Sequence, residues 1–256
     1  MTTSTLKQTA PFGEDMSDGE WQARVDLAAC YRVVDYFGMS ELIRTHISAR
    51  VPGTAHVFLM KPDGLLFEEV TASSLVKLDV DGNVIGDPAQ RVNKAGFTIH
   101  SAVHMARADA QCVLHVHTRD GTAVSAQKDG LLPLSQHSAR FHGDIGYHDY
   151  EGIALDLDER ERLIAHLGGH SVLMLRNHGL LTVGRSMAEA FNRAYYLELA
   201  CQVQIAAQAS GAELIYLPQD VCERTATQVR EFGPLGERDW PALLRLLDRQ
   251  SSDYHH

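Results

Sequence analysis

The sequence predicts a mixed α/β or α+β fold in which helices cover both faces of a central sheet. Short apolar runs bounded by turn residues, typical of strands, alternate along the chain with longer segments that repeat apolar residues at helical spacing. The chain has 256 residues, of which 45% are apolar, so it is long enough to bury a substantial core.

The N-terminal residues 1–16 differ in composition from the rest of the chain. They are rich in Thr and Ser and contain Pro11 and Gly13, so we expect a mobile arm. Ser17-Asp-Gly-Glu20 then has the form of a capping box and precedes an apolar stripe at helical spacing. We therefore predict a first helix that begins after Ser17 and ends at Gly38.

A series of short strand signals comes after the first helix. Turn residues such as Pro52-Gly53 separate these signals, and Asp81-Gly82 is typical of a hairpin turn. Such neighbouring short strands suggest antiparallel pairing. The predicted strands are 43–51, 56–60, 65–70, 74–79 and 83–85.

The second half of the chain alternates helix and strand signals. Residues 137–150 are irregular and rich in His, Tyr and Gly, as in a loop of a binding site. We see no internal repeat and no linker, so we interpret residues 17–211 as one domain and 212–256 as a C-terminal helical extension. The predicted helices are 94–107, 118–126, 187–210, 219–231 and 240–249, together with one that Asp156-x-x-Glu159 caps and that runs to Leu167. The predicted strands are 111–117, 131–134, 172–176 and 180–183.

Composition restricts the classes of partner. The formal net charge is −10 and there is no long Lys/Arg block, which argues against nucleic acid or a membrane surface as a partner. The four cysteines are scattered without a CxxC pair, so we expect buried thiols and no disulfide framework. No signal-type segment or apolar run of bilayer length is present in the sequence. These features predict a protein of the reducing cytoplasm.

Two histidines, His115 and His117, end the apolar run that begins at Cys112. Residues two apart in a strand point to the same face, so both imidazoles would leave it together. A third, His178, comes after another apolar run, in the tight turn Asn-His-Gly. This set fits an open site for Zn²⁺, Mn²⁺, Co²⁺ or Fe²⁺. The spacing alone leaves open that these are hydrogen-bonded core histidines, because the chain has 14 of them.

Three motifs together resemble the class II aldolase/adducin family: Asn93-Lys-Ala-Gly-Phe-Thr-Ile-His100, His115-Val-His117-Thr and Arg176-Asn-His178-Gly-Leu. The likeness extends from about Trp21 to Gly211. The family includes L-fuculose-phosphate aldolase, the ribulose-phosphate 4-epimerase and the adducin head domain. The resemblance implies a class II aldolase-like three-layer sandwich whose central sheet is mainly antiparallel.

The resemblance also implies that His115, His117 and His178 hold one divalent metal, with Zn²⁺ expected and Mn²⁺, Co²⁺ or Fe²⁺ as alternatives. In the family, the metal polarises a carbonyl and a hydroxyl of the sugar and stabilises an enediolate.

The sequence departs from the aldolases at one motif. Gly96 stands where the aldolases and the epimerase carry Glu or Asp, and Lys94 and Ala95 stand where they carry serines that help bind phosphate. This run resembles the adducin-like branch. Likewise, His46-Ile-Ser48 stands where the aldolases have a Gly-Asn phosphate loop. We therefore expect a metal with three protein ligands.

Further residues are candidates for contact with the substrate. Lys94 could offer positive charge to a carboxylate or phosphate, or be a solvated lysine at a helix start. His100 lies one helical turn after Gly96 and could serve as acid or base, although a packed structural histidine is the preferred interpretation. His137 and Tyr147 could donate protons or simply be exposed.

These inferences lead to two main hypotheses. The first is a metal-dependent aldolase-like lyase, or a related epimerase, that acts on a small hydroxy-carbonyl compound such as a sugar or sugar acid. The rival is a non-catalytic domain used for assembly, as in adducin. The aldolase relatives are tetrameric, so the resemblance implies a homo-oligomer, and we expect the helix at 187–210 to offer part of its interface.

Overall fold

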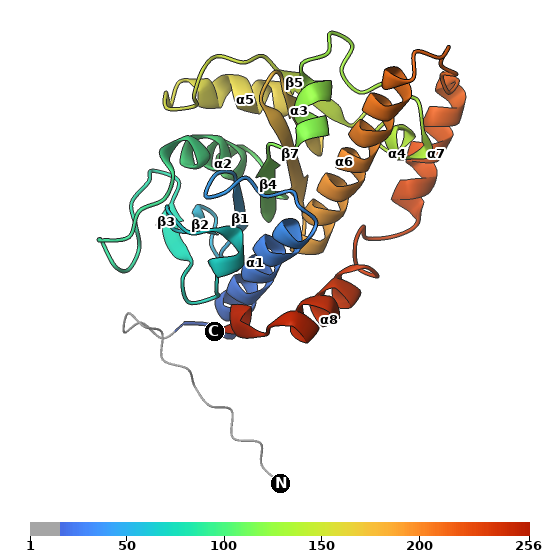
Figure 1. Ribbon diagram of the computed structural model, residues 1–256. Helices are drawn as coiled ribbons and strands as arrows, with labels where there is room; N and C mark the ends of the chain where they lie inside the picture. Colours follow the sequence, from blue (N-terminus) through green and yellow to red (C-terminus); the bar gives the residue numbers. More distant parts are fainter. Residues whose placement is uncertain (1–15) are drawn as a thin grey trace.

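The computed structural model describes residues 16–256, so the arm predicted for residues 1–16 lies outside the described residues except for Met16 (Figure 1). The helices are α1 (Asp18–Tyr36), α2 (Lys94–Ala106), α3 (Arg119–Ser125), α4 (Gln136–Ala139), α5 (Glu159–Leu167), α6 (Met187–Ala209), α7 (Gln219–Glu231) and α8 (Trp240–Gln250), with short 3₁₀ turns η1 (Phe67–Glu69) and η2 (Asp253–His255). The strands are β1 (His46–Arg50), β2 (Val57–Met60), β3 (Val76–Asp79), β4 (Cys112–Val116), β5 (Ile145–His148), β6 (Val172–Leu175) and β7 (Gly179–Gly184).

The strands form one seven-stranded sheet in the order β3-β2-β1-β4-β7-β6-β5. All neighbouring pairs are antiparallel except β5 and β6, which run parallel. The predicted mainly antiparallel sheet is confirmed.

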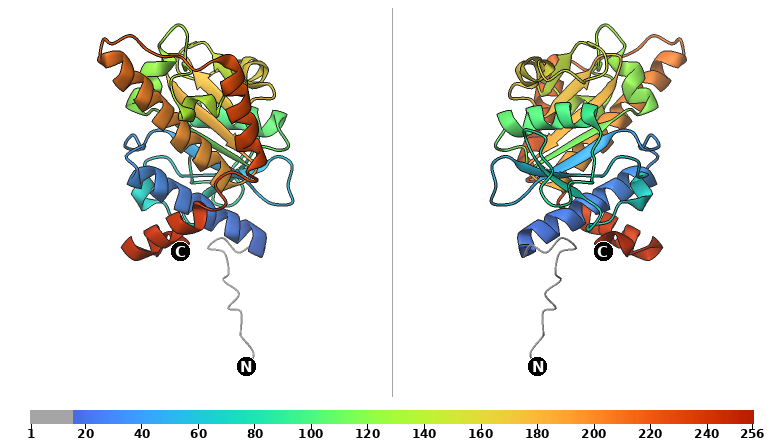
Figure 2. Two further views of the ribbon diagram at one scale, coloured as in Figure 1. Left: turned by 90° about the vertical axis from the view of Figure 1, so that its right-hand side faces the viewer. Right: turned by 90° about the vertical axis from the view of Figure 1, so that its left-hand side faces the viewer.

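Helices cover both faces of this sheet (Figure 2). Helices α1 and α6 lie on one face, over a large apolar cluster that includes Leu114 and Leu197. Helices α2 and α5 lie on the other face, over a smaller cluster that includes Leu173 and Leu181. All six residues of strand β7 are buried, so both faces of the strand need a covering layer of helices. The predicted sandwich of helices, sheet and helices is confirmed.

The predicted N-terminal caps of α1 and α6 form. Ser17 Oγ accepts a hydrogen bond from the Glu20 amide at 3.1 Å, and Ser186 Oγ accepts one from the Glu189 amide at 3.2 Å. The Glu20 carboxylate does not complete a capping box, because it pairs with Arg24 and with Lys77 of β3. It therefore ties α1 to the sheet.

Several predicted strands are absent or shortened. Residues 131–134 form no strand, because the Leu131 amide donates to the Tyr147 hydroxyl and the Leu132 amide to Gln204 Oε1. Residues 67–69 form η1, which begins where the Leu66 amide donates to Glu69 Oε2 at 2.7 Å. Side chains thus satisfy backbone groups that a strand would pair with a neighbour.

Two further boundaries differ from the prediction. The predicted strand 43–51 begins only at His46, because Thr45 has a φ of 61° and cannot continue an extended strand. Residues 83–85 make only an isolated bridge, between Leu78 and Val84. The irregular segment 137–150 contains most of α4 and all of β5.

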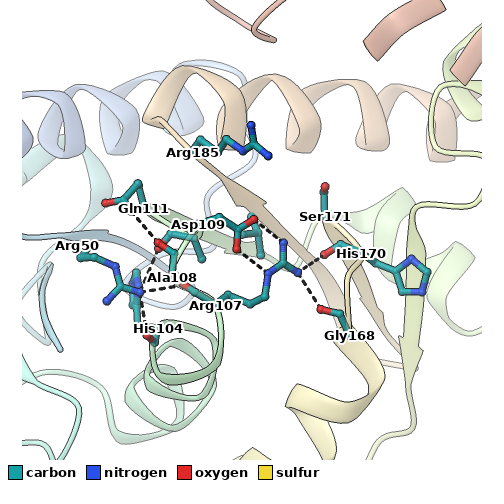
Figure 3. A network of polar contacts seen from close by, with 12 residues as sticks. Arg50, His104, Arg107, Ala108, Asp109, Gln111, Gly168, His170, Ser171 and Arg185 are labelled. Atoms are coloured by element: carbon teal, nitrogen blue, oxygen red, sulfur yellow. Dashed lines mark hydrogen bonds and ion pairs between the residues drawn. The ribbon is translucent and has the colours of Figure 1, made fainter. Parts of the chain in front are cut away.

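Arg50 and Arg107 stabilise one end of the paired strands β1 and β4 (Figure 3). At this end β1 finishes and β4 begins. The Arg50 guanidinium donates to the carbonyls of His104 at 2.8 Å and Arg107 at 3.0 Å, which end helix α2. Arg107 pairs with Asp109 at 2.8 Å and donates to the carbonyl of Gly168 at 2.9 Å. The network ties α2 to β1 and to the turn between α5 and β6.

The C-terminal residues pack back onto the domain. Tyr254 is buried, its hydroxyl donates to Asp248 at 2.8 Å, and its carbonyl accepts from the Ala72 amide at 3.0 Å. The cysteines at 30, 112, 201 and 222 are free and buried. Within residues 16–256, no helix has the length and apolar character needed to cross a membrane.

Candidate metal centre

The fold brings His115, His117 and His178 together at the other end of β4. Each offers a ring nitrogen, and these atoms all lie within 4.8 Å of one another. The ring centroids are 4.6 to 4.9 Å apart. The cluster forms because β4 pairs with β7: His115 lies in β4, His117 directly follows it, and His178 directly precedes β7.

The Asn-His-Gly turn places His178 against β4. Asn177 adopts a φ of 56°, the left-handed conformation that Asn tolerates better than most residues. A Cβ on Gly179 would lie 2.4 Å from the carbonyl oxygen of Val116, so only glycine allows this approach of β7 to β4. The turn signal in the sequence thus has a direct structural cause.

Hydrogen bonds orient two of the rings. His115 Nδ1 lies 3.0 Å from the carbonyl oxygen of Leu180, which can only accept, so Nδ1 carries the proton and Nε2 faces the cluster. His117 Nδ1 lies 2.7 Å from Glu41 Oε2. The Nε2 atoms of His115 and His117 are 2.9 Å apart. A carboxylate behind a ligating imidazole is a common arrangement at metal sites.

A second carboxylate supports the end of β4. Glu198, on α6, accepts hydrogen bonds from the Thr118 hydroxyl and from the Gly121 amide at 3.1 Å. Burial raises the pKa of this carboxyl group. Neither Glu41 nor Glu198 is predicted from the sequence, because they lie 76 and 80 residues from their partners and no local pattern marks them.

The electrostatics favour neutral imidazoles. Burial, and then the neighbouring His178, lowers the pKa of His115 well below its ordinary value. Burial, and then His117, lowers the pKa of His178 to about 4. Neutral imidazole is the form that binds metal ions, so this donor set fits a divalent cation of the zinc type.

Two side chains outside the set of predicted site residues lie beside the cluster. His46 of β1 is the strand partner of His115, and their near-parallel rings are 6.4 Å apart between centroids. The Tyr150 ring lies 6.0 Å from that of His178. Tyr150 belongs to the irregular segment that the sequence predicts to border a site.

The space beside Gly96 is filled. A Cβ on Gly96 would lie 2.5 Å from Cγ and Nδ1 of His46, so the imidazole occupies the volume that a side chain would need. In the sequence, Gly96 indicates only that the acidic side chain of the aldolases is missing at this position. The structure shows that a ring from a neighbouring strand takes that place.

The other predicted site residues have varied surroundings. His100 is fully buried, and its Nδ1 contacts Ser48 Oγ at 2.6 Å. Lys94 is exposed at the start of α2. The His137 ring packs 5.7 Å from that of Tyr196 on α6. The Tyr147 hydroxyl bonds to the Leu131 amide, away from the three histidines. The structure therefore brings the metal-ligand candidates together but gives His137 and Tyr147 contacts elsewhere.

A mainly antiparallel sheet between two helical layers, with three convergent histidines at a strand end, defines an aldolase-like fold with a candidate metal site. The chain belongs to the class II aldolase/adducin family, because the Class II Aldolase and Adducin N-terminal domain matches residues 25–205.

Similar proteins include both aldolases and adducins. An aldolase II superfamily protein from Pseudomonas syringae is 52% identical with a TM-score of 0.88, over 94% of this chain and 98% of that one. L-fuculose 1-phosphate aldolase from Glaciozyma antarctica is 28% identical with a TM-score of 0.80, over 92% of each chain. Alpha-adducin from Mus musculus is 44% identical over 90% of this chain, which spans only 33% of adducin.

Proposed function

We propose that this protein is a divalent-metal-dependent lyase of the aldolase type that acts on a small hydroxy-carbonyl compound, such as a sugar or sugar acid. The observation that carries the proposal is the convergence of ring nitrogens from His115, His117 and His178. The similarity to an L-fuculose 1-phosphate aldolase supports it.

In this proposal each side chain has a defined task. His115, His117 and His178 would hold the cation, with Zn²⁺ expected and Mn²⁺, Co²⁺ or Fe²⁺ as alternatives. A bound cation would supply Lewis acidity toward the oxygens of the substrate. Glu41 fixes the ring of His117 through the 2.7 Å contact, and the Leu180 carbonyl fixes the ring of His115. These contacts keep both Nε2 atoms directed at one point.

A non-catalytic assembly domain is the second candidate. The observation that favours it is the 44% identity to alpha-adducin over 90% of this chain. The two functions differ in what they require of the histidine cluster. A lyase needs the cluster to bind a cation and to accept a substrate, whereas an assembly domain needs neither.

We also propose that the protein is a homo-oligomer, with a tetramer as the expected form. One face of α6 packs within the chain, and its other face, where Val203 is 37% exposed, is the part left for the interface expected at 187–210. The segment after Tyr150 exposes large apolar side chains: Ile153 at 72%, Leu155 at 61% and Leu157 at 51%. Analytical ultracentrifugation at micromolar concentration tests this, and a monomer would refute it.

Metal analysis followed by a substrate screen tests the function. The purified protein, loaded with each candidate metal, is assayed for retro-aldol cleavage of hydroxy acids, sugar acids and sugar phosphates. We expect one metal per chain and cleavage of at least one compound. His56→Ala, which removes an exposed histidine, serves as the matched control for His178→Ala. A protein that binds one metal but cleaves nothing would favour the assembly function.

A further inference from the structure

A cleft of about 790 Å³ lies at the far end of strand β7 from the histidine cluster. Gly184, the last residue of β7, lines this cleft, whereas His178 directly precedes the strand. The six residues of β7, at about 3.3 Å each, put roughly 20 Å between the two places. The cleft is therefore separate from the candidate metal centre, and it has the volume of a site for a small molecule.

The lining of this cleft is rich in arginine. Five arginines and four acidic residues line it, which gives the lining a net charge of +1 in a chain whose formal net charge is −10. The cleft is therefore more positive than the rest of the molecule, as expected of a site for an anion. The arginines are Arg107, Arg140, Arg185, Arg193 and Arg230.

Two of the arginines are neutralised by acidic residues of the same cleft. Arg107 pairs with Asp109 at 2.8 Å, and Arg193 of α6 pairs with Glu189 at 2.8 Å. Of the other two acidic residues, one accepts a hydrogen bond from the Ser171 amide at 2.7 Å and one is exposed. Three guanidinium groups, those of residues 140, 185 and 230, are left without a carboxylate partner among residues 16–256.

Arg140, which directly follows α4, is half-buried without such a partner. Its guanidinium carbon lies 3.8 Å from the centre of the Tyr196 ring, and Nη2 donates to Asn192 Oδ1 at 3.1 Å. Burial lowers the pKa of Arg140. Asp239 is the nearest acidic residue that opposes this effect, but its carboxylate accepts from Asn192 at 2.9 Å. The stacked guanidinium is thus held in place while most of its N–H groups stay available.

Arg185 and Arg230 bring two further guanidinium groups to the cleft from separate elements. Arg185 lies in the turn between β7 and α6, and Figure 3 shows no bond between its side chain and the Arg107–Asp109 pair. Arg107 lowers the pKa of the Asp109 carboxyl group, and the charge of Arg185 adds to this effect. Arg230, in the last turn of α7, donates to the Thr227 hydroxyl at 3.0 Å. Both side chains are exposed, so both can meet a ligand from solution.

We propose that this cleft binds a phosphorylated small molecule whose phosphate group is held by Arg140, Arg185 and Arg230. A guanidinium presents its N–H groups in a planar fork that matches the oxygens of a phosphate. Three such groups without carboxylate partners suit a phosphate monoester, which carries about two negative charges near pH 7. Phe141 and Leu235 also line the cleft, so the ligand has an organic part that packs on apolar side chains. The inference uses none of the three clustered histidines and does not depend on the proposed function.

Binding of inorganic phosphate and of adenosine 5′-monophosphate (AMP) tests this inference. Adenosine, which lacks the phosphate, is the comparison ligand. The protein is first freed of metal, so that the histidine cluster offers no cation to a phosphate, and is then measured again with zinc. Arg185→Gln/Arg230→Gln removes two exposed charges from the cleft. The matched control, Arg245→Gln/Arg249→Gln, removes two exposed charges from α8, outside the cleft. Calorimetry measures affinity, and urea unfolding checks that each variant folds.

We expect the metal-free wild type to bind AMP, and to bind inorganic phosphate more weakly. Arg185→Gln/Arg230→Gln should weaken both by roughly 10- to 100-fold, because charged hydrogen bonds to the phosphate are lost. Arg245→Gln/Arg249→Gln should change both affinities by less than about 3-fold, because salt screens distant charges. Adenosine should bind at least about 10-fold more weakly than AMP.

Four results would overturn the inference. The first is a wild-type protein that binds neither inorganic phosphate nor AMP at millimolar concentration. The second is an equal loss of affinity in the two double variants, which would reflect net charge alone. The third is adenosine binding as tight as that of AMP. The fourth is binding that requires zinc and is unchanged in Arg185→Gln/Arg230→Gln, which would place the phosphate at the histidine cluster and leave the proposed function standing.

Discussion

The two ends of strands β1 and β4 are built differently, although β1 spans only His46–Arg50. At the Arg50 end, guanidinium groups donate to the carbonyls that end α2 and to the Asp109 carboxylate. At the His46 end, imidazole nitrogens face one another, and both nitrogens of His46 are without partners.

Under the proposed function, this difference separates an end that stabilises the fold from an end that binds a metal ion. Groups at the arginine end satisfy backbone atoms that would otherwise be buried and unpaired, so that end stabilises the fold. The histidine end holds neutral donors that gain little from one another, which is expected where an external ligand supplies the missing interactions. Substitutions at each end can test this separation.

The largest effect is expected for metal binding in the double variant His115→Ala/His117→Ala. Removal of two of the three convergent imidazoles leaves one ligand, so stoichiometric metal should be lost. Metal content after dialysis against equimolar zinc measures this, with His166→Ala/His170→Ala as the control. A full equivalent of zinc in the double variant would show that the site lies elsewhere.

At the arginine end, Arg50→Met should lower the free energy of unfolding by about 3 kcal/mol, because the carbonyls of Ala55, His104 and Arg107 lose a donor. Zinc content should stay at one per chain. Urea unfolding compares the variant with Arg245→Met, which removes an exposed arginine and should change stability by no more than about 0.5 kcal/mol. Equal stability of the two variants would contradict the structural role of Arg50.

Acid should destabilise the metal-free protein through its buried histidines. Burial lowers the pKa of His100 and His104 from 6.5 to about 3, and the charge of Arg50 adds to the effect at His104. Between pH 6.5 and about pH 3, the unfolded chain therefore binds more protons at these histidines than the folded chain does. Stability from these groups is therefore complete above pH 6.5 and lost as the pH falls toward 3.

Each such histidine contributes up to about 1.4 kcal/mol per pH unit. Between pH 6 and pH 4, His104→Phe should reduce the slope of the unfolding free energy against pH by about 1.4 kcal/mol per pH unit, which corresponds to about one proton. Urea unfolding at several pH values measures the slope, and the same slope in variant and wild type would disprove the assignment.

The smallest effect on stability is expected for Gly96→Ala. The new Cβ would displace the His46 ring, an overpacking cost of about 1–3 kcal/mol, but alanine favours a helix interior by about 1 kcal/mol over glycine. The net loss of stability, measured by urea unfolding, should therefore be at most about 2 kcal/mol. Gly169→Ala, where a Cβ meets nothing within 4 Å, is the control. A gain of stability equal to that of Gly169→Ala would show that the His46 ring does not resist the new Cβ.

Local patterns in the sequence determined the order of the elements and the metal-ligand candidates. The alternation of a strand puts His115 and His117 on one face, and the Asn177-His178-Gly179 turn marks a chain reversal, so both signals lie within a few residues. The caps at Ser17 and Ser186 are local in the same way. Such patterns predict an element because the residues that stabilise it lie close together in the sequence.

Only the tertiary structure decided what surrounds those histidines. The contact of Glu41 with His117 joins residues that are 76 apart in the sequence. His46, on strand β1, lies against Gly96, on helix α2. The turn η1 and the unpaired segment 131–134 likewise depend on side chains that reach backbone groups. Strand pairing and the approach of helices to the sheet set most of these distances, and no periodicity within one segment encodes them.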